Sequence, residues 1–266
     1  MPESFSAPVS GRKFPYATAL ISLAVVTFYF YLSGGSLFIS DERLSAFSLS
    51  PGGSPLGGVA HLFAHVGPRH LASNVLPLLA FGYVFEMSVG WLEAFFVFLA
   101  SGAIAGGVFS LLNPAVALVG ASTGVAGLIG GSCLSAPKSA FVLLLFTPLF
   151  VHFILLPSAD LASGGQAAAL EKKSGDLADL YAAQVAQNRP KEAQQTAQEI
   201  SAVEQSRLAL SKGIEREGKS SSDALVHVVG ALVGMAFVIL FRRSAADKGV
   251  AELEETIGSL GRALGF

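Results

Sequence analysis

Ser122 lies in the segment "VGASTGVAGLIGG" and is flanked by glycines in the G-x-S-x-G pattern of serine hydrolases. A serine becomes a nucleophile when a base takes its hydroxyl proton, and His227 in "ALVHVVGALVG" is a candidate for that base. Both residues stand in long apolar stretches, where a polar side chain is costly unless it faces a bundle interior or a water-filled cavity. A membrane helix that packs through its glycines would show the same residues around Ser122, so both interpretations stay open at this point.

His70 and Asn74 form a second polar pair in an apolar stretch. Their i, i+4 spacing places both on one face of a helix, where they can direct two hydrogen-bond donors at one point. Donors arranged in this way stabilise the negative oxygen that forms when a nucleophile attacks a carbonyl. The alternative is that the two side chains satisfy each other or a neighbouring carbonyl.

The other histidines admit different interpretations. His61 and His65 also have i, i+4 spacing, so a metal site is conceivable if that stretch is helical. The next position in line is Asn74, and no carboxylate within the apolar stretch accompanies the histidines, so we expect no metal ion and no other cofactor. His152, in a later apolar stretch, is expected to form a buried hydrogen bond between helices, with a contact at a substrate gate as the alternative.

The composition is that of a membrane protein. Hydrophobic residues make up 52% of the chain and charged residues 14%, and the mean hydropathy is +0.59. Soluble domains average about 25% charged residues. The net charge of -2 argues against nucleic-acid binding, so the expected surroundings are a lipid bilayer.

Hydropathy predicts six membrane-spanning segments of roughly the 20 residues that cross a hydrocarbon core. They are expected at 15–33, 70–86, 91–112, 120–136, 139–157 and 223–241. Basic residues in short loops set the orientation. With six spans, one side of the membrane carries the basic residues Arg12, Lys13, Lys138, Arg242 and Arg243. Both termini are therefore expected in the cytoplasm.

A polar stretch interrupts the apolar chain before the last span. Residues 158–222 hold 8 of the 17 Lys and Arg and 9 of the 19 Asp and Glu. Ala, Gln and Glu predict helix, and Asn188 to Pro190 predict a break, so we expect a helical hairpin, with a flexible tether as the alternative. The expected organisation is five spans in 1–157, an extracytoplasmic insert in 158–222, a sixth span in 223–243 and a cytoplasmic tail in 244–266.

Glycine spacing predicts how the spans that carry the serine and the last histidine meet. The glycines are Gly127 and Gly131 after Ser122, and Gly230 and Gly234 after His227. Glycines four residues apart let membrane helices approach closely. Packing of these two faces would bring the hydroxyl and the imidazole within reach at one depth, as a Ser/His dyad requires.

The α/β-hydrolases also carry G-x-S-x-G, with the serine on a turn between a strand and a helix. Here no strand is expected before Ser122, and the flanking apolar runs have membrane length. The pattern therefore does not indicate that fold.

Taken together, the motifs resemble those of the rhomboid intramembrane serine proteases. The family's H-x3-H-x4-H-x3-N pattern is similar to His61, His65, His70 and Asn74, and its E-x3-G is similar to Glu86 and Gly90. Its G-x-S is similar to Gly120 to Ser122, and its H-x2-G-x3-G to His227, Gly230 and Gly234. The resemblance covers about 60–135 and 223–241 and implies an all-α membrane protein, a six-helix rhomboid-like bundle with a polar helical insert between helices five and six.

The resemblance also implies an activity, that of an intramembrane serine endopeptidase with a Ser122/His227 dyad and no third acid. Its oxyanion hole would combine the serine backbone N–H with the side chains of His70 and Asn74. His65 would support the first loop, and Glu86 would be structural at the cytoplasmic side. Substrates would be single-pass membrane proteins cleaved near the outer end of their helix, in a bacterial inner membrane.

Departures from the family pattern favour an alternative, a catalytically inactive rhomboid-like protein that binds membrane helices. Thr123 stands where glycine usually follows the serine, and its side chain could crowd the oxyanion pocket. Ala126 stands where an aromatic residue commonly braces the histidine, and the Trp-Arg pair of the first loop is missing. The insert is unusually long, and we expect it to cap or gate the site or to recruit substrate.

Overall fold

The computed structural model describes residues 14–219 and 224–264, and over these residues the regular structure is helical. An antiparallel bridge joins Leu49 and Leu118 between two loops. The all-helical fold class expected from the sequence is thereby confirmed. Arg12, Lys13 and the expected boundary at 222–223 lie outside the described residues.

Five helices of the described chain are long and apolar enough to cross a membrane. They are α1 (Tyr16–Ser33), α4 (Pro68–Ser88), α5 (Trp91–Leu112), the continuous helix Pro137–Ala186 and α10 (Ala224–Phe241). The other expected span, 120–136, is α6 (Ser122–Ser135), whose 14 residues extend only about 21 Å at the usual helical rise. Because a hydrocarbon core is about 30 Å thick, length and hydropathy identify five spans in the described residues and leave the expected sixth unconfirmed.

α6 is enclosed by other helices. Ten of its 14 residues are buried, and it packs against α4, α5 and α10. The large apolar side chains around it, which include Phe85, Phe98 and Val238, are almost inaccessible. A helix surrounded by protein can have its ends satisfied by loops at membrane depth, so it does not need the length of a lipid-facing helix.

The segment between α1 and α4 contains two short helices, α2 (Asp41–Ser45) and α3 (Gly57–Ala60). Leu49 and Leu118 exchange backbone hydrogen bonds of 2.9 Å, which joins this first loop to the chain just before α6. The first loop therefore lies at the end of the bundle where Ser122 begins its helix.

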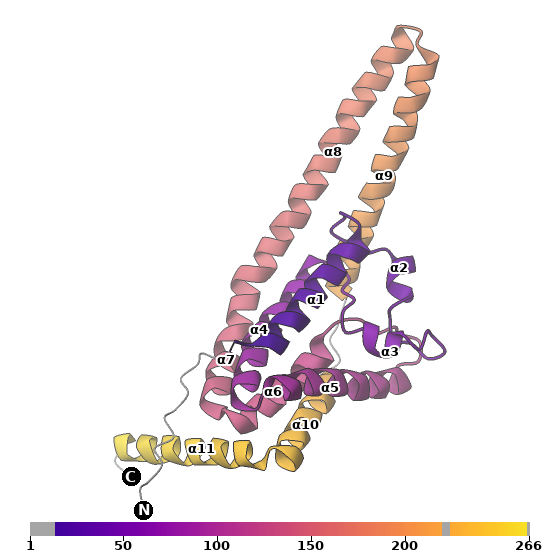
Figure 1. The fold of residues 1–266 in the computed structure, drawn as a ribbon. Helices are drawn as coiled ribbons and strands as arrows, with labels where there is room; N and C mark the ends of the chain where they lie inside the picture. The colour runs from indigo at the N-terminus through magenta and orange to yellow at the C-terminus, as the bar shows by residue number, and fades with distance from the viewer. Residues whose placement is uncertain (1–13, 220–223, 265–266) are drawn as a thin grey trace, which may run out of the picture.

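α8 (Leu156–Ala186) and α9 (Pro190–Lys219) form a long hairpin that extends away from the other helices (Figure 1). Between them Asn188 adopts a φ of 54°, and α9 begins at Pro190, whose ring favours the first position of a helix. The chain therefore reverses at the break that the sequence predicts.

α7 (Pro137–Phe150) continues into α8 through a π-helical turn, η1 (Val151–Leu155). Pro148 and Pro157 flank this turn, and neither can donate the N–H that an α-helix needs. A π turn takes up the resulting mismatch. His152 lies in this turn with an exposed side chain, so the expected buried hydrogen bond between helices is wrong.

α11 (Arg243–Leu264) follows α10 and runs across the end of the bundle away from the hairpin (Figure 1). It contacts α6, α7 and α10, and Glu255 pairs with Lys138 of α7 at 3.4 Å. The hairpin and α11 thus lie at opposite ends of the molecule.

Candidate active site

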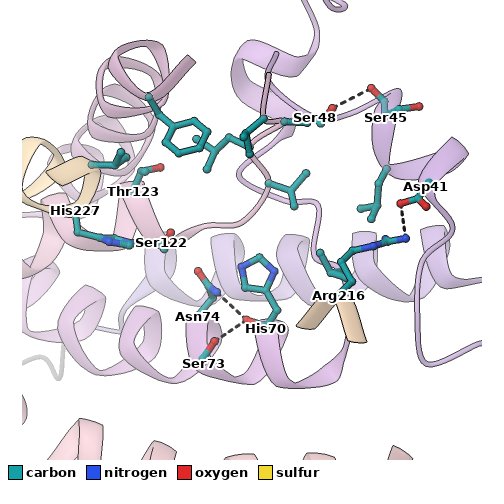
Figure 2. Close-up of a pocket in the computed structure, with 18 residues that line it drawn as sticks. Asp41, Ser45, Ser48, His70, Ser73, Asn74, Ser122, Thr123, Arg216 and His227 are labelled. Carbon is teal, nitrogen blue, oxygen red and sulfur yellow. Dashed lines mark hydrogen bonds and ion pairs between the residues drawn. The ribbon is translucent and has the colours of Figure 1, made fainter. Parts of the chain in front are cut away.

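A cavity of about 790 Å³ lies where the first loop, α4, α6, α9 and α10 meet. Ser122, His227, His70 and Asn74 all line it, and Figure 2 shows these four side chains gathered around one space. The structure therefore brings together the residues that sequence reasoning singled out for nucleophilic attack and for oxyanion stabilisation.

Ser122 is the first residue of α6, and His227 lies in the first turn of α10. In Figure 2 the imidazole of His227 points toward Ser122. Such a placement allows the imidazole to act as a base for the hydroxyl.

The approach of α10 to α6 depends on glycines. A Cβ atom added to Gly230 would lie 2.5 Å from the carbonyl oxygen of Thr123, and one added to Gly234 would overlap the backbone of Gly127. Gly131 similarly faces the Gly234 carbonyl. Backbone contacts this close are possible only where both helices lack side chains, so the glycine seam sets the depth at which the serine and the imidazole meet.

His70 lies in the first turn of α4, beside the segment that leads to the serine. A Cβ atom on Gly120 would fall 2.6 Å from His70 Nε2, and Gly120 has a φ of 116°, which L side chains rarely adopt. Gly120 is thus required both by its own backbone and by the imidazole next to it. The Nδ1 atom of His70 is buried without a hydrogen-bond partner among the described residues.

Asn74 uses part of its hydrogen-bonding capacity inside α4. Its Nδ2 donates to the His70 carbonyl at 2.7 Å, so the interpretation that this side chain satisfies a neighbouring carbonyl applies to one of its two N–H groups. Its Oδ1 is buried with no partner in the described part of the chain. The second N–H is the group that could serve an oxyanion.

Two histidines of the first loop hold the segment before the serine. His65 is fully buried, and burial lowers its pKa to about 3. The neutral ring accepts the Ala121 N–H at Nε2 (3.4 Å), while Nδ1 lies 3.2 Å from the Phe63 carbonyl and therefore carries the proton. The His61 carbonyl accepts the N–H of Gly120 at 2.8 Å. Both contacts fix the backbone that leads into α6.

Glu86 does not line the cavity. Its buried carboxylate accepts the backbone N–H groups of Ala17 (3.1 Å) and Thr18 (2.8 Å) and the Thr18 hydroxyl (2.8 Å). These backbone donors belong to the first turn of α1, where a helix has no acceptors of its own. Glu86 therefore caps α1.

Thr123, the residue that departs from the family pattern, is buried and lines the cavity. Its Oγ1 has no hydrogen-bond partner among the described residues. The side chain thus takes up space directly beside Ser122, where a glycine would leave it open. Ala126 is also buried, and it faces Gly230 of α10.

Three charged residues near the cavity were missed by sequence reasoning. Arg216 of α9 and Asp41 of α2 form an ion pair at its edge (Figure 2). Glu217 of α9 accepts the backbone N–H of His70 at 3.0 Å. In the sequence they appear as ordinary charges of a polar helix and a polar loop, and no local spacing links them to the site.

Among the residues that the structure describes, no group of three or more His, Cys, Asp or Glu side chains is arranged to hold a metal ion.

Comparison with known proteins connects the central part of the chain to one family. Residues 55–168 match the family model described as the Rhomboid domain. The matched segment contains Ser122, His70 and Asn74 and ends before His227. No curated protein and no solved structure matches the chain.

Proposed function

We propose that this chain, which belongs to the rhomboid family, is an intramembrane serine endopeptidase that cleaves transmembrane segments with a Ser122/His227 dyad. One observation carries the proposal: a serine and a histidine from separate helices face one cavity because a glycine seam brings their helices together. His70 and Asn74 line the same cavity, and a protein that only binds helices has no need of this set.

In the proposed reaction, His227 takes the proton of Ser122 Oγ while that oxygen attacks the carbonyl carbon of the scissile bond. The carbonyl oxygen becomes negative and accepts hydrogen bonds from the serine backbone N–H and from the side chains of His70 and Asn74. The C–N bond then breaks, and the imidazolium gives its proton to the leaving nitrogen.

The acyl-serine ester that remains is hydrolysed by water. His227 again acts as the base and takes a proton from the water as its oxygen attacks the ester carbon. Collapse of the second intermediate releases the new carboxylate of the substrate, and the proton returns to the Ser122 oxygen. The pair of residues thus ends in its starting state, with no cofactor consumed.

The proposed substrates are single-pass membrane proteins with a small residue at the cleavage site. A peptide bond inside a helix is hidden by the hydrogen bonds of the helix, so the substrate must unwind locally before Ser122 can reach it. Residues that break helices lower the free energy of that unwinding.

The proposed location is a bacterial inner membrane, with both termini in the cytoplasm and the cavity toward the outer face. The bias of basic residues supports this orientation. It places the α8–α9 hairpin outside the cell membrane, on the side from which water reaches the cavity.

A fluorophosphonate probe on the detergent-purified full-length protein tests the activity, because it forms a covalent adduct with an activated serine. Wild type is expected to label, and Ser122→Ala to lose labelling completely. His227→Ala is expected to slow labelling by at least about a thousandfold, since the members of such a dyad act as a unit. Circular dichroism and size-exclusion chromatography show whether each variant is folded.

The second candidate is a catalytically inactive rhomboid protein that binds membrane helices. Thr123 favours it, because its buried side chain lies beside the nucleophile. A folded wild-type protein that fails to label would support this candidate and overturn the protease.

A further inference from the structure

The hairpin returns to the candidate active site in the last turns of α9. Arg216 lines the cavity, donates to the Ile39 carbonyl at 3.3 Å and pairs with Asp41. The next residue, Glu217, bonds to the backbone of His70. The polar insert is therefore attached both to the first loop and to α4, at the point where the cavity lies.

α4 begins without a capping side chain of its own. Gly67 occupies the position before the helix, and no side-chain cap is present there. Pro68 follows it and has no N–H, so the first donor groups of α4 belong to the next residues. Glu217 supplies the acceptor for one of them, the His70 N–H at 3.0 Å. A carboxylate at this end of a helix is also favoured by the helix dipole.

The chain leaves space for this carboxylate. A Cβ atom on Gly67 would lie 2.6 Å from Glu217 Oε1 and from the ring of Phe38. A serine, threonine or aspartate at position 67, the usual capping residues, would therefore displace Glu217. α4 therefore lacks a cap from its own residue 67 and is capped by Glu217 of α9 in its place.

The cap acts on the backbone of a proposed oxyanion-hole residue. Glu217 holds the N–H of His70, and the His70 carbonyl in turn accepts Asn74 Nδ2 at 2.7 Å. His70 Nε2 lies beside Gly120, two residues before the nucleophile. Hydrogen bonds thus connect α9 to the backbone of His70 and, through the His70 carbonyl, to the side chain of Asn74.

We propose that Glu217 is a positioning residue: its carboxylate caps α4 and keeps His70 and Asn74 in place beside Ser122. This inference rests on the proposed function, because it assigns Glu217 a role in the reaction that the cavity is proposed to perform. The last turns of α9 then complete the proposed active site, and this role does not depend on contacts made by the rest of the hairpin.

The surroundings of Glu217 favour a held carboxylate. Arg69 of α4 and Asp160 of α8 form an ion pair of 3.2 Å, and both act electrostatically on Glu217, as Glu217 does on Tyr29 of α1. Burial raises the pKa of Glu217, while the His70 N–H and the positive charge of Arg69 oppose that rise. The hydrogen bond from the His70 N–H therefore favours the ionised form of the carboxylate that caps the helix.

The same device occurs at α1, where Glu86 caps the backbone of Ala17 and Thr18 from a distant helix. No residue of α1 lines the cavity. The Glu86 cap therefore lies away from the cavity, whereas the Glu217 cap acts on a residue that lines it.

The test compares Glu217→Ala, Glu217→Gln and the control Glu199→Gln in the full-length protein. Glu199 is exposed on the same helix, so the control makes the same charge change away from the cavity. The first measurement is the rate of fluorophosphonate labelling, because the phosphonyl oxygen of the probe occupies the oxyanion position. The second is hydrogen–deuterium exchange over residues 68–74.

Glu217→Ala is expected to slow labelling by about 10-fold to 100-fold, since a shift of about 1 Å at catalytic groups has effects of this size. Exchange over 68–74 is expected to rise in the same variant. Glu217→Gln keeps an oxygen acceptor and is expected to lose only about fivefold, because a neutral hydrogen bond is weaker than a charged one. The Glu199→Gln protein should match wild type in both measurements.

Wild-type labelling rates in Glu217→Ala, with raised exchange at 68–74, would show a cap with no bearing on the reaction and overturn the proposal. Should the alanine variant fail to fold, the fivefold loss in Glu217→Gln decides, and its absence overturns the proposal equally. A failure of the proposed function is recognised separately, because the folded wild type itself would then not label.

Discussion

At the residue scale, the site combines polar atoms that are buried and lack protein partners. His70 Nδ1, Asn74 Oδ1 and Thr123 Oγ1 are three such atoms within the described structure, and all three residues line the cavity with Ser122. A buried polar atom without a partner costs free energy. Their occurrence around one serine is understandable if a substrate or water supplies the missing hydrogen bonds in the proposed reaction.

The pH dependence of labelling is the prediction that belongs to this scale. Above the raised pKa of Glu217 the wild type carries a carboxylate, and below it carries a neutral carboxyl that resembles glutamine. The ratio of labelling rates between wild type and Glu217→Gln is therefore expected to be about fivefold above that pKa. This ratio of labelling rates should approach one as the pH falls through the pKa of Glu217. Taking the ratio removes any pH dependence that both proteins share.

Although Glu217→Gln is expected to slow labelling, it is not expected to lower the free energy of unfolding. The folded protein binds the Glu217 proton more tightly than the unfolded chain does, because its pKa is raised from 4.5. Ionisation of this group thus lowers the free energy of unfolding as the pH rises between 4.5 and the raised value. Glu217→Gln removes that loss, so its thermal unfolding temperature above this window should be no lower than that of wild type. A Glu217→Gln protein that is less stable than wild type above this window would contradict the destabilising effect expected from the raised pKa of Glu217.

At the scale of elements, α6 is defined by its neighbours. It is too short and too rich in glycine to be stable alone in lipid, yet its burial against α4, α5 and α10 makes it the centre of the bundle. The glycine seam with α10 fixes the depth of Ser122 relative to His227, and the histidines of the first loop fix the chain that enters α6. The site is therefore assembled from helix contacts and not from one local motif.

Gly230→Ala tests the seam. Its Cβ atom would lie 2.5 Å from the Thr123 carbonyl oxygen, so α10 must move away from α6. We expect labelling to fall by at least about 100-fold and the free energy of unfolding to fall by about 1 to 3 kcal/mol, although Ser122 and His227 are intact. Labelling rate and thermal unfolding are the measurements.

The matched control is Gly107→Ala in α5, where an added Cβ atom has nothing within 4 Å. This variant should label like wild type. Equal labelling by the Gly230→Ala and Gly107→Ala proteins would mean that the seam does not set the distance between the serine and the imidazole.

At the scale of the whole molecule, the hairpin and α11 lie at opposite ends of the bundle (Figure 1). The cavity is at the hairpin end, because Arg216 of α9 lines it. In the proposed orientation the hairpin and the cavity face outward, and α11 lies in the cytoplasm. The last turns of α9 thus lie at the cavity, while the tip of the α8–α9 hairpin lies far from it.

Cysteine accessibility tests this orientation. Cys133 is the single cysteine, so Cys133→Ser gives a background for Gln187→Cys at the tip of the hairpin and for Lys248→Cys in α11. A membrane-impermeant maleimide is expected to modify position 187 in intact cells. Position 248 should react only after the membrane is permeabilised, and the reverse pattern would place α11 outside and the tip of the hairpin in the cytoplasm.

Much of this protein could be predicted from local sequence. The apolar runs predict membrane helices, and the spacing of His70 with Asn74 and of the glycines after Ser122 and His227 predicts which faces carry chemistry and packing. The reversal of the insert at Asn188 follows from local turn chemistry as well. These features depend on residues only a few positions apart, so their spacing in the sequence is enough to predict them.

The tertiary structure decided what depends on distant contacts. α6 can be short because protein and not lipid surrounds it, and His152 is exposed in a turn of which no residue is buried. Glu217 reaches the N–H of His70 across 147 positions of sequence. A contact between residues so far apart leaves no periodic signal, since the two positions become neighbours only when α9 returns to the bundle. The sequence by itself therefore determined the candidate reacting groups, and only the fold decided which group holds them in place.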